Sequence, residues 1–294
     1  MFKVDEYGKV TISLGGVCTL GCKHCYTTTK AFKHQLAMSS SNVMTRLQNM
    51  NVNFTTICIS GDTDCFLDPD AGLDLIEKIV SAYTLETIMF TTRLIPSPQI
   101  IQRLIQLGEI CRKRKQLFIP CVSVVSFSYP NSVELVRRVP SSQDRLAFLN
   151  HLSDAGLTCF LALRPTFPFS VVPKEEVVKI IDFVGSHPAA VLGEVLLVDN
   201  DNEIARRLHL DSTMVAQSQK SHMSFLEQHT LWTKCLLSEE VDFVREQCHS
   251  RGMPYFLRSM SAVNYLKSVQ AFTGNPLKQA ASDWTQFEID NIFP

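Results

Sequence analysis

Apolar residues follow two different periodicities along the chain, which predicts alternating strands and helices. Short runs rich in β-branched and aromatic residues predict six strands, at 10–14, 54–59, 87–92, 118–127, 157–163 and 191–198. The segments between them carry apolar residues at helical spacing, which predicts helices at 42–50, 72–83, 98–113, 143–155 and 174–184. This alternation indicates parallel strands joined by right-handed crossovers, in either an α/β barrel or an open doubly wound sheet.

The pattern changes after residue 198. Residues 199–235 are polar and are predicted to be helical, and a helix at 239–250, a short strand at 255–257 and a helix at 262–269 follow. No low-complexity linker or shift in composition divides the chain. We therefore expect a core at 1–198 and a C-terminal extension at 199–294 that packs on it.

Charge and hydropathy argue against nucleic acid and membrane as binding partners. The 28 Lys and Arg residues nearly balance the 29 Asp and Glu residues, so no long-range field favours nucleic acid. The basic run at 112–115 follows a predicted helix, and it is either a solvated helix end or a phosphate-binding patch. No apolar run reaches the ~18 residues of a membrane-spanning helix, and the first residues lack the pattern of a targeting segment. We expect a cytoplasmic chain with no membrane partner and with reduced thiols.

Three of the ten cysteines, Cys18, Cys22 and Cys25, are clustered directly after the first predicted strand. With three and two residues between them, their thiolates can bind three irons of a 4Fe-4S cube and leave the fourth iron open. An open metal position lets a site bind a substrate or cofactor directly. A structural zinc site completed by Cys58, Cys65 or a histidine is one alternative, although no second CxxC pair is present. A redox dithiol of Cys22 and Cys25 is another, but it leaves Cys18 unexplained.

This cysteine spacing, with His24 before the third cysteine and Tyr26 after it, resembles the signature of the radical S-adenosylmethionine (SAM) superfamily. The resemblance implies an α/β fold, a partial (β/α)6 TIM-type barrel, here with a helical C-terminal extension. It implies one 4Fe-4S cluster on the three cysteines, with His24 and Tyr26 beside the cofactor and with SAM chelating the fourth iron. An external electron donor such as flavodoxin or ferredoxin would drive reductive cleavage of SAM to a 5'-deoxyadenosyl radical, which abstracts hydrogen from a substrate.

The resemblance extends to the carboxyl ends of later strands, where this type of barrel places its chemistry. Ser60, Gly61 and Asp62 stand where the superfamily often has Gly-Gly-Glu, which holds the SAM amino group; a turn aspartate is the alternative for Asp62. Ser126 is a candidate contact for the ribose or carboxylate of SAM. Arg164 interrupts an apolar strand before a proline and is a candidate to bind the carboxylate of SAM. The alternative is that Arg164 forms a salt bridge inside the fold.

Cys65 is the single candidate for a catalytic side chain. It would lie near the cofactor, and a thiol can donate a hydrogen atom to a product radical; a buried structural cysteine is the alternative. The run at 62–69, together with 91–93 and the run 139–142 that leads to Arg145, looks like the spore photoproduct lyase-like branch of the superfamily.

These observations lead to one expected function and two alternatives. We expect a radical SAM enzyme that acts on a small molecule, an amino acid or a peptide, as a lyase, a mutase or an enzyme of biosynthetic modification. The first alternative is the same chemistry on DNA or a nucleotide. The second is a non-enzymatic zinc or iron-sulfur binding module.

Overall fold

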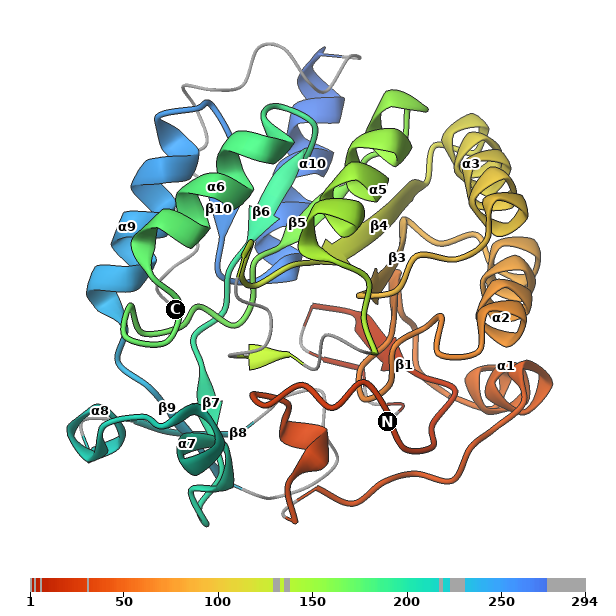
Figure 1. Ribbon diagram of the computed structural model, residues 1–294. Helices are drawn as coiled ribbons and strands as arrows, with labels where there is room; N and C mark the ends of the chain where they lie inside the picture. The colour runs from red at the N-terminus through yellow and green to blue at the C-terminus, as the bar shows by residue number, and fades with distance from the viewer. Residues whose placement is uncertain are drawn as a thin grey trace.

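Parallel strands form the main sheet of the computed structural model, which describes residues 2, 4–5, 7–30, 32–128, 133–134, 138–216, 219–222 and 231–273 (Figure 1). The sheet has seven strands in the spatial order β1-β2-β3-β4-β5-β6-β10. They are β1 (Lys9–Ile12), β2 (Thr56–Ile59), β3 (Thr87–Thr92), β4 (Leu117–Ser123), β5 (Phe160–Ala162), β6 (Ala190–Leu192) and β10 (Tyr255–Phe256). Every neighbouring pair is parallel. The predicted α/β partial barrel is confirmed, and β10 adds a strand beside β6.

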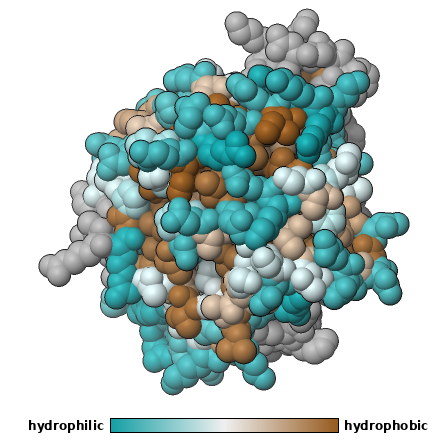
Figure 2. All heavy atoms as spheres, turned by 90° about the vertical axis from the view of Figure 1, so that its right-hand side faces the viewer, coloured by the Kyte–Doolittle hydropathy of each residue, from teal (hydrophilic) through white to brown (hydrophobic). Residues whose placement is uncertain are grey.

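Helices cover the outer face of this sheet, and Figure 1 shows them along the outer arc of the molecule. They are α1 (Ser40–Gln48), α2 (Pro69–Ala82), α3 (Pro98–Lys113), α5 (Ser142–Asp154), α6 (Lys174–Val184) and α9 (Ser238–His249). Ser97 and Ser141 start two of them by accepting hydrogen bonds from the backbone N–H groups of Ile100 and Asp144. Figure 2 shows the side of the molecule on the right of Figure 1, where hydrophilic residues predominate and hydrophobic ones show between them.

The inner face of the sheet packs on the last described helix, α10 (Ser259–Thr273). Side chains alternate along each strand, so Ile57 and Ile59 of β2 join the core under the outer helices, whereas Cys58 joins the core under α10. Val263 and Leu266 of α10 belong to that second core. No helix in the described ranges is long and apolar enough to cross a membrane.

The segment 199–235 differs from the predicted helix. It contains two short helices, α7 (Glu203–Leu208) and α8 (Ser212–Ala216), and two strands, β8 (Gln219–His222) and β9 (Leu231–Lys234). These strands form an antiparallel sheet of order β7-β9-β8 with β7 (Leu197–Val198), so the predicted strand at 191–198 is divided between β6 and β7. The helical prediction was wrong because β9 is held by pairing with β7, a distant contact that local periodicity does not reveal.

Candidate functional site

The loop after β1 brings the three clustered cysteines to the carboxyl end of the sheet. Gly15 lies near its start with a φ of +72°, and a Cβ atom there would lie 2.4 Å from the carbonyl oxygen of Leu36. Glycine is the residue that tolerates both the left-handed backbone and this close approach. The loop leads into the 3-10 helix η1 (Tyr26–Thr28), which begins directly after Cys25.

Cys18, Cys22 and Cys25 are free thiols that lie close enough to influence one another electrostatically. Cys22 is buried and packs with Leu20 and Val139, whereas Cys18 and Cys25 are half-buried. Burial raises the pKa of the Cys22 thiol to about 11 and also raises the pKa of the Cys18 thiol. These two thiols are therefore protonated in the metal-free chain at neutral pH, and a bound metal would displace their protons.

The arrangement of the thiols can be compared with what different metal groups need. Across the described part of the chain, no three His, Cys, Asp or Glu side chains gather closely enough to hold a single metal ion. A structural zinc ion requires ligands that converge on one point. A 4Fe-4S cube instead takes each thiolate on a different iron, so its ligands stand further apart. Three free thiols on one loop are the donor set that a 4Fe-4S cube takes, with one thiolate on each of three irons.

A chain of buried charges leads from the cysteine loop to α5. Nη2 of Arg93 lies 3.1 Å from Nε2 of His24, and Nη1 of Arg93 forms an ion pair with Glu134. The second carboxylate oxygen of Glu134 accepts from Nη2 of Arg145 at 2.5 Å, and Nη1 of Arg145 donates to the carbonyl oxygen of Ser123 at 2.6 Å. Burial, and then the Arg93 cation, lower the pKa of His24 to about 3. The imidazole is therefore neutral, and its Nε2 can accept a hydrogen bond from Arg93.

Asp64 connects the loop after β2 to the loop after β3. Its carboxylate accepts hydrogen bonds from the Thr92 hydroxyl at 2.8 Å and from the backbone N–H groups of Arg93 at 2.6 Å and Phe66 at 3.0 Å. Burial raises the pKa of Asp64, although these hydrogen bonds oppose the shift. These contacts fix the backbone at Arg93 and therefore the direction in which its side chain leaves the backbone.

The turn after β2 contains the predicted Ser60, Gly61 and Asp62. The Tyr26 hydroxyl donates a hydrogen bond to the Gly61 carbonyl oxygen, and Oγ of Ser60 donates to the carbonyl oxygen of Thr63 at 2.6 Å. Asp62 is 5% exposed, and its Oδ2 has no hydrogen-bond partner among the residues that the structure describes. An unpaired buried carboxylate oxygen reduces stability, so a hydrogen-bond donor of a bound ligand would stabilise this atom.

Arg164 lies in the same region as Tyr26 and Asp62. Burial raises the pKa of Tyr26 well above its usual value, and Asp62 and Glu194 raise it further, whereas Arg164 opposes the shift. Nη2 of Arg164 lies 3.5 Å from Oγ1 of Thr91. Within the described ranges no carboxylate forms an ion pair with Arg164, so the predicted alternative of an internal salt bridge is not seen there.

Ser126 and Cys65 have partners inside the protein. The buried Ser126 hydroxyl donates to Oε2 of Glu176 on α6 at 3.1 Å. Cys65 is 4% exposed, belongs to the apolar core that includes Phe66, and has a thiol pKa raised well above its usual value by burial. Their roles as a SAM contact and a hydrogen-atom donor stay predictions.

The small sheet and α7 lie beside η1, as Figure 1 shows. The Trp232 ring on β9 meets the Tyr26 ring edge to face, with 6.0 Å between centroids, and Arg207 on α7 donates to the Thr28 hydroxyl. Trp232 is 1% exposed, and its Nε1 has no hydrogen-bond partner among the described residues. Sequence reasoning did not identify Trp232, because nothing in the chain around it signals that β9 will lie beside the cysteine loop.

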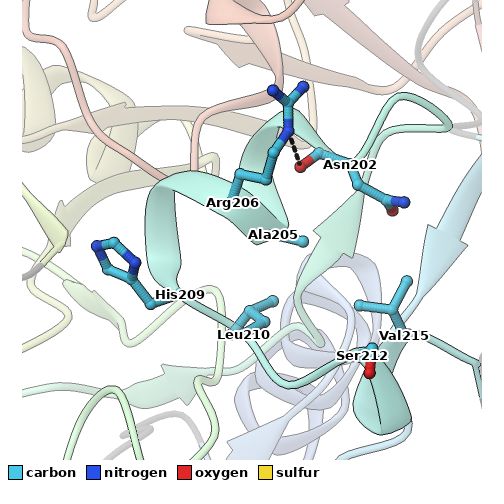
Figure 3. Close-up of a pocket in the computed structure, with 7 residues that line it drawn as sticks. All are labelled: Asn202, Ala205, Arg206, His209, Leu210, Ser212 and Val215. Carbon is cyan, nitrogen blue, oxygen red and sulfur yellow. Dashed lines mark hydrogen bonds between the residues drawn. The ribbon is translucent and has the colours of Figure 1, made fainter.

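A surface hollow of about 560 Å³ lies on α7 and α8 (Figure 3). Asn202, Arg206, His209 and Val215 are among its lining residues, and Nε of Arg206 donates to the Asn202 carbonyl oxygen at 3.4 Å. None of the residues predicted to bind the cluster or SAM lines this hollow.

Comparison with known proteins gives matches in structure. No family model matches the sequence, and no curated protein matches it. Streptococcus suis SuiB, in a crystal structure with S-adenosylmethionine bound, matches with a TM-score of 0.56 and 12% identity over 88% of this chain and 52% of SuiB. A radical SAM methyltransferase from Sphaerobacter thermophilus matches with a TM-score of 0.54 and 14% identity over 85% of this chain and 65% of the enzyme.

These matches establish the fold class. The chain has the partial-barrel fold of radical SAM enzymes, so the predicted resemblance is confirmed at the level of fold. The chain spans about half the length of SuiB and 65% of the methyltransferase.

Proposed function

We propose that this chain is a radical SAM enzyme that holds one 4Fe-4S cluster on Cys18, Cys22 and Cys25. The observation that carries the proposal is the position of these three free thiols, on the loop after β1 at the carboxyl end of a parallel sheet of the radical SAM type. When bound, the cluster and SAM together supply a 5'-deoxyadenosyl radical that removes hydrogen from a substrate.

Side chains of this chain would position SAM. The unpaired Oδ2 of Asp62 is placed to accept a hydrogen bond from an ammonium group, and the half-buried Arg164 to pair with a carboxylate. Tyr26 holds the Gly61 carbonyl oxygen and so fixes the turn that presents Asp62. Trp232 packs on Tyr26 and excludes water from that side of η1.

We infer a small molecule, an amino acid or a peptide as the substrate, and not DNA. The basic run at 112–115 ends α3 and precedes β4, so it lies at the amino end of the strands, opposite the cysteine loop. In addition, Nη1 of Arg114 is used within the fold, where it donates to the Val80 carbonyl oxygen at 2.6 Å. A nucleic acid held by this run would lie at the end of the sheet opposite the cysteines.

An external one-electron donor such as flavodoxin or ferredoxin would reduce the cluster from the outer side of the cysteine loop. Val17 is 60% exposed next to Cys18, and Leu36, which contacts Gly15, is 90% exposed. These are the apolar side chains that a protein donor docked on this side of the loop would cover.

The test replaces Cys18, Cys22 and Cys25 by Ala one at a time, with Cys111→Ala on α3 as the control. After anaerobic reconstitution we expect about four irons per wild-type chain, as one cluster requires. We expect loss of iron and of all 5'-deoxyadenosine formation in each of the three variants, because each thiolate binds a different iron. Cys111 is buried away from the loop, so its variant should keep both properties.

Several outcomes contradict the proposal. Activity retained by any of the three variants would refute the ligand assignment, and more than about four irons per chain would refute a single cluster. Zinc in place of iron in protein purified without oxygen, together with no SAM cleavage after reduction, would favour a binding module. Incubation with deuterated candidate substrates then identifies the one that transfers deuterium to 5'-deoxyadenosine.

A further inference from the structure

The charge chain of Arg93, Glu134 and Arg145 is more deeply buried than any other ion pair in the described part of the protein. The side chains are 14%, 0% and 0% exposed, respectively. A buried charge reduces stability unless an opposite charge pairs with it. Two arginines and one glutamate cannot be paired one to one. Two cations share the Glu134 carboxylate, and Asp64, which accepts from the backbone N–H of Arg93, is a further carboxylate close to Arg93.

Arg93 is paired less completely with Glu134 than Arg145 is. Glu134 accepts from Arg145 through both of its carboxylate oxygens, at 3.2 Å and 2.5 Å, so Arg145 is the more completely paired cation. Arg145 also donates to the carbonyl oxygen of Ser123. The second terminal nitrogen of Arg93 lies 3.1 Å from Nε2 of His24, and an imidazole is either neutral or positive, so it cannot cancel the Arg93 charge.

Arg93 also lies close to the cysteines. Its Nη2 lies 3.1 Å from Nε2 of His24, which stands between Cys22 and Cys25 in the chain. Leu94, the next residue, packs with the cysteines in the same small core. The Asp64 carboxylate lies nearby and fixes the backbone of Arg93, and it is kept in every variant described below.

We propose that Arg93 is a positioning residue that sets the reduction potential of the cluster, and that Glu134 and Arg145 hold it in place. This inference rests on the proposed function, because it requires a cluster on the three cysteines. One-electron reduction by an external donor adds one negative charge to the cluster. A fixed cation at Arg93 stabilises that reduced state and makes the reduction potential less negative.

The proposal predicts potential shifts of opposite sign in two variants. Arg93→Met removes the cation and should make the potential more negative, whereas Glu134→Gln removes the balancing anion and should make it less negative. For each we expect about a tenfold change in the reduction equilibrium, which is about 59 mV for a one-electron couple. Arg93→Lys keeps the charge and should stay close to wild type.

The measurement is the EPR signal of the reduced cluster at a series of poised potentials, without SAM, on reconstituted protein of known iron content. Arg103→Met is the control, since Arg103 pairs with Glu77 between exposed helices and should leave the potential unchanged. Circular dichroism and thermal melting show which variants fold. If Glu134→Gln does not fold, Arg145→Met replaces it; it should make the potential more negative by less than Arg93→Met does, because Arg145 contacts Glu134 and Ser123, whereas Arg93 contacts His24 between the cysteines.

The possible results distinguish a failure of this inference from a failure of the proposed function. Absence of a cluster in the wild-type protein would refute the proposed function itself. A cluster that forms normally, with a wild-type potential in Arg93→Met, would overturn only the inference. Shifts of the same sign in Arg93→Met and Glu134→Gln would also overturn it, because general disturbance of the loop, not charge, would then explain both.

Discussion

Two regions on the same strands bury side chains of opposite character. Under α10, the inner face of the sheet buries Cys58, Met89 and Phe160 against Val263 and Leu266, and the polar side chains buried on the same strand faces, Thr56 and Thr87, are uncharged. At the carboxyl ends of the strands, the loops bury Asp62, Arg93 and Glu134 and leave polar atoms without partners in the described chain. Apolar burial stabilises a fold directly, whereas buried charges reduce stability unless they are paired. The difference separates the part of the sheet that maintains the fold from the part that can bind a ligand.

The change of character occurs within a few residues of chain. Cys58 of β2 lies under α10, and Asp62, whose Oδ2 has no partner among the described residues, follows in the next turn. Met89 of β3 lies under α10, and Arg93 follows directly after the end of the strand. The parallel arrangement of the strands gathers all of these ends at one edge, which is why single residues on separate loops can form one site.

The largest effect is expected from a cavity under α10. Leu266 is 1% exposed, so Leu266→Ala should lower the free energy of unfolding by about 2–5 kcal/mol through lost burial and an unfilled cavity. Asn264→Ala, on the exposed side of the same helix, is the matched control and should change it by less than about 0.5 kcal/mol. Urea unfolding measures both, and iron content per folded chain should stay at the wild-type level. A variant that stays stable but loses iron would contradict the separation of the two regions.

A smaller loss of stability, with loss of the cluster, is expected from Gly15→Ala in the cysteine loop. A Cβ at Gly15 would meet the Leu36 carbonyl oxygen at 2.4 Å, and the φ of +72° adds strain of about 1–3 kcal/mol. Gly252→Ala is the matched control, because its φ is +69° but nothing lies within 4 Å of the added Cβ. Urea unfolding and iron content after reconstitution should both fall further in Gly15→Ala. Equal effects in the two variants would show that the Leu36 contact has no part in shaping the loop.

The sequence predicts the strand and helix core well because the signals there are local. The predicted strand at 87–92 and the helices at 98–113 and 174–184 agree with β3, α3 and α6 to the residue. In contrast, the predicted strand at 118–127 ends at Ser123: Val124 and Val125 continue the apolar run, and the Val124 N–H still donates to the Ala162 carbonyl oxygen at 3.2 Å, but neither residue belongs to a strand. Apolar composition alone does not distinguish a strand from buried loop residues. The wrong helical prediction at 199–235 has a different cause, because β9 is held there by its distant pairing with β7.

The candidate site divides in the same way. The three cysteines are visible in the sequence because their spacing along one loop carries the chemistry. Asp62 and Arg164 are identified through resemblance and through their places after apolar strands. Glu134 and Trp232 carry no such signal, since Glu134 matters only through its contacts with Arg93 and Arg145, and Trp232 only because β9 pairs with β7. Residues whose role depends on long-range contacts require the structure.

The smallest effect is expected where a charge pair lies at the α10 side of the sheet. Nζ of Lys267 and Oε2 of Glu86 are 2.5 Å apart, but the two side chains are 30% and 58% exposed, so solvent screens the pair. A double-mutant cycle of Lys267→Met and Glu86→Gln should give a coupling of about 0.2–1 kcal/mol in the free energy of unfolding. That coupling should disappear at about 1 M salt, where the screening length is about 3 Å. A coupling above about 2 kcal/mol that persists in salt would show that charge also stabilises the fold on this side. In that case, exposure to solvent would not explain why the Lys267–Glu86 pair and the buried Arg93–Glu134 pair differ, and only their positions in the fold would distinguish them.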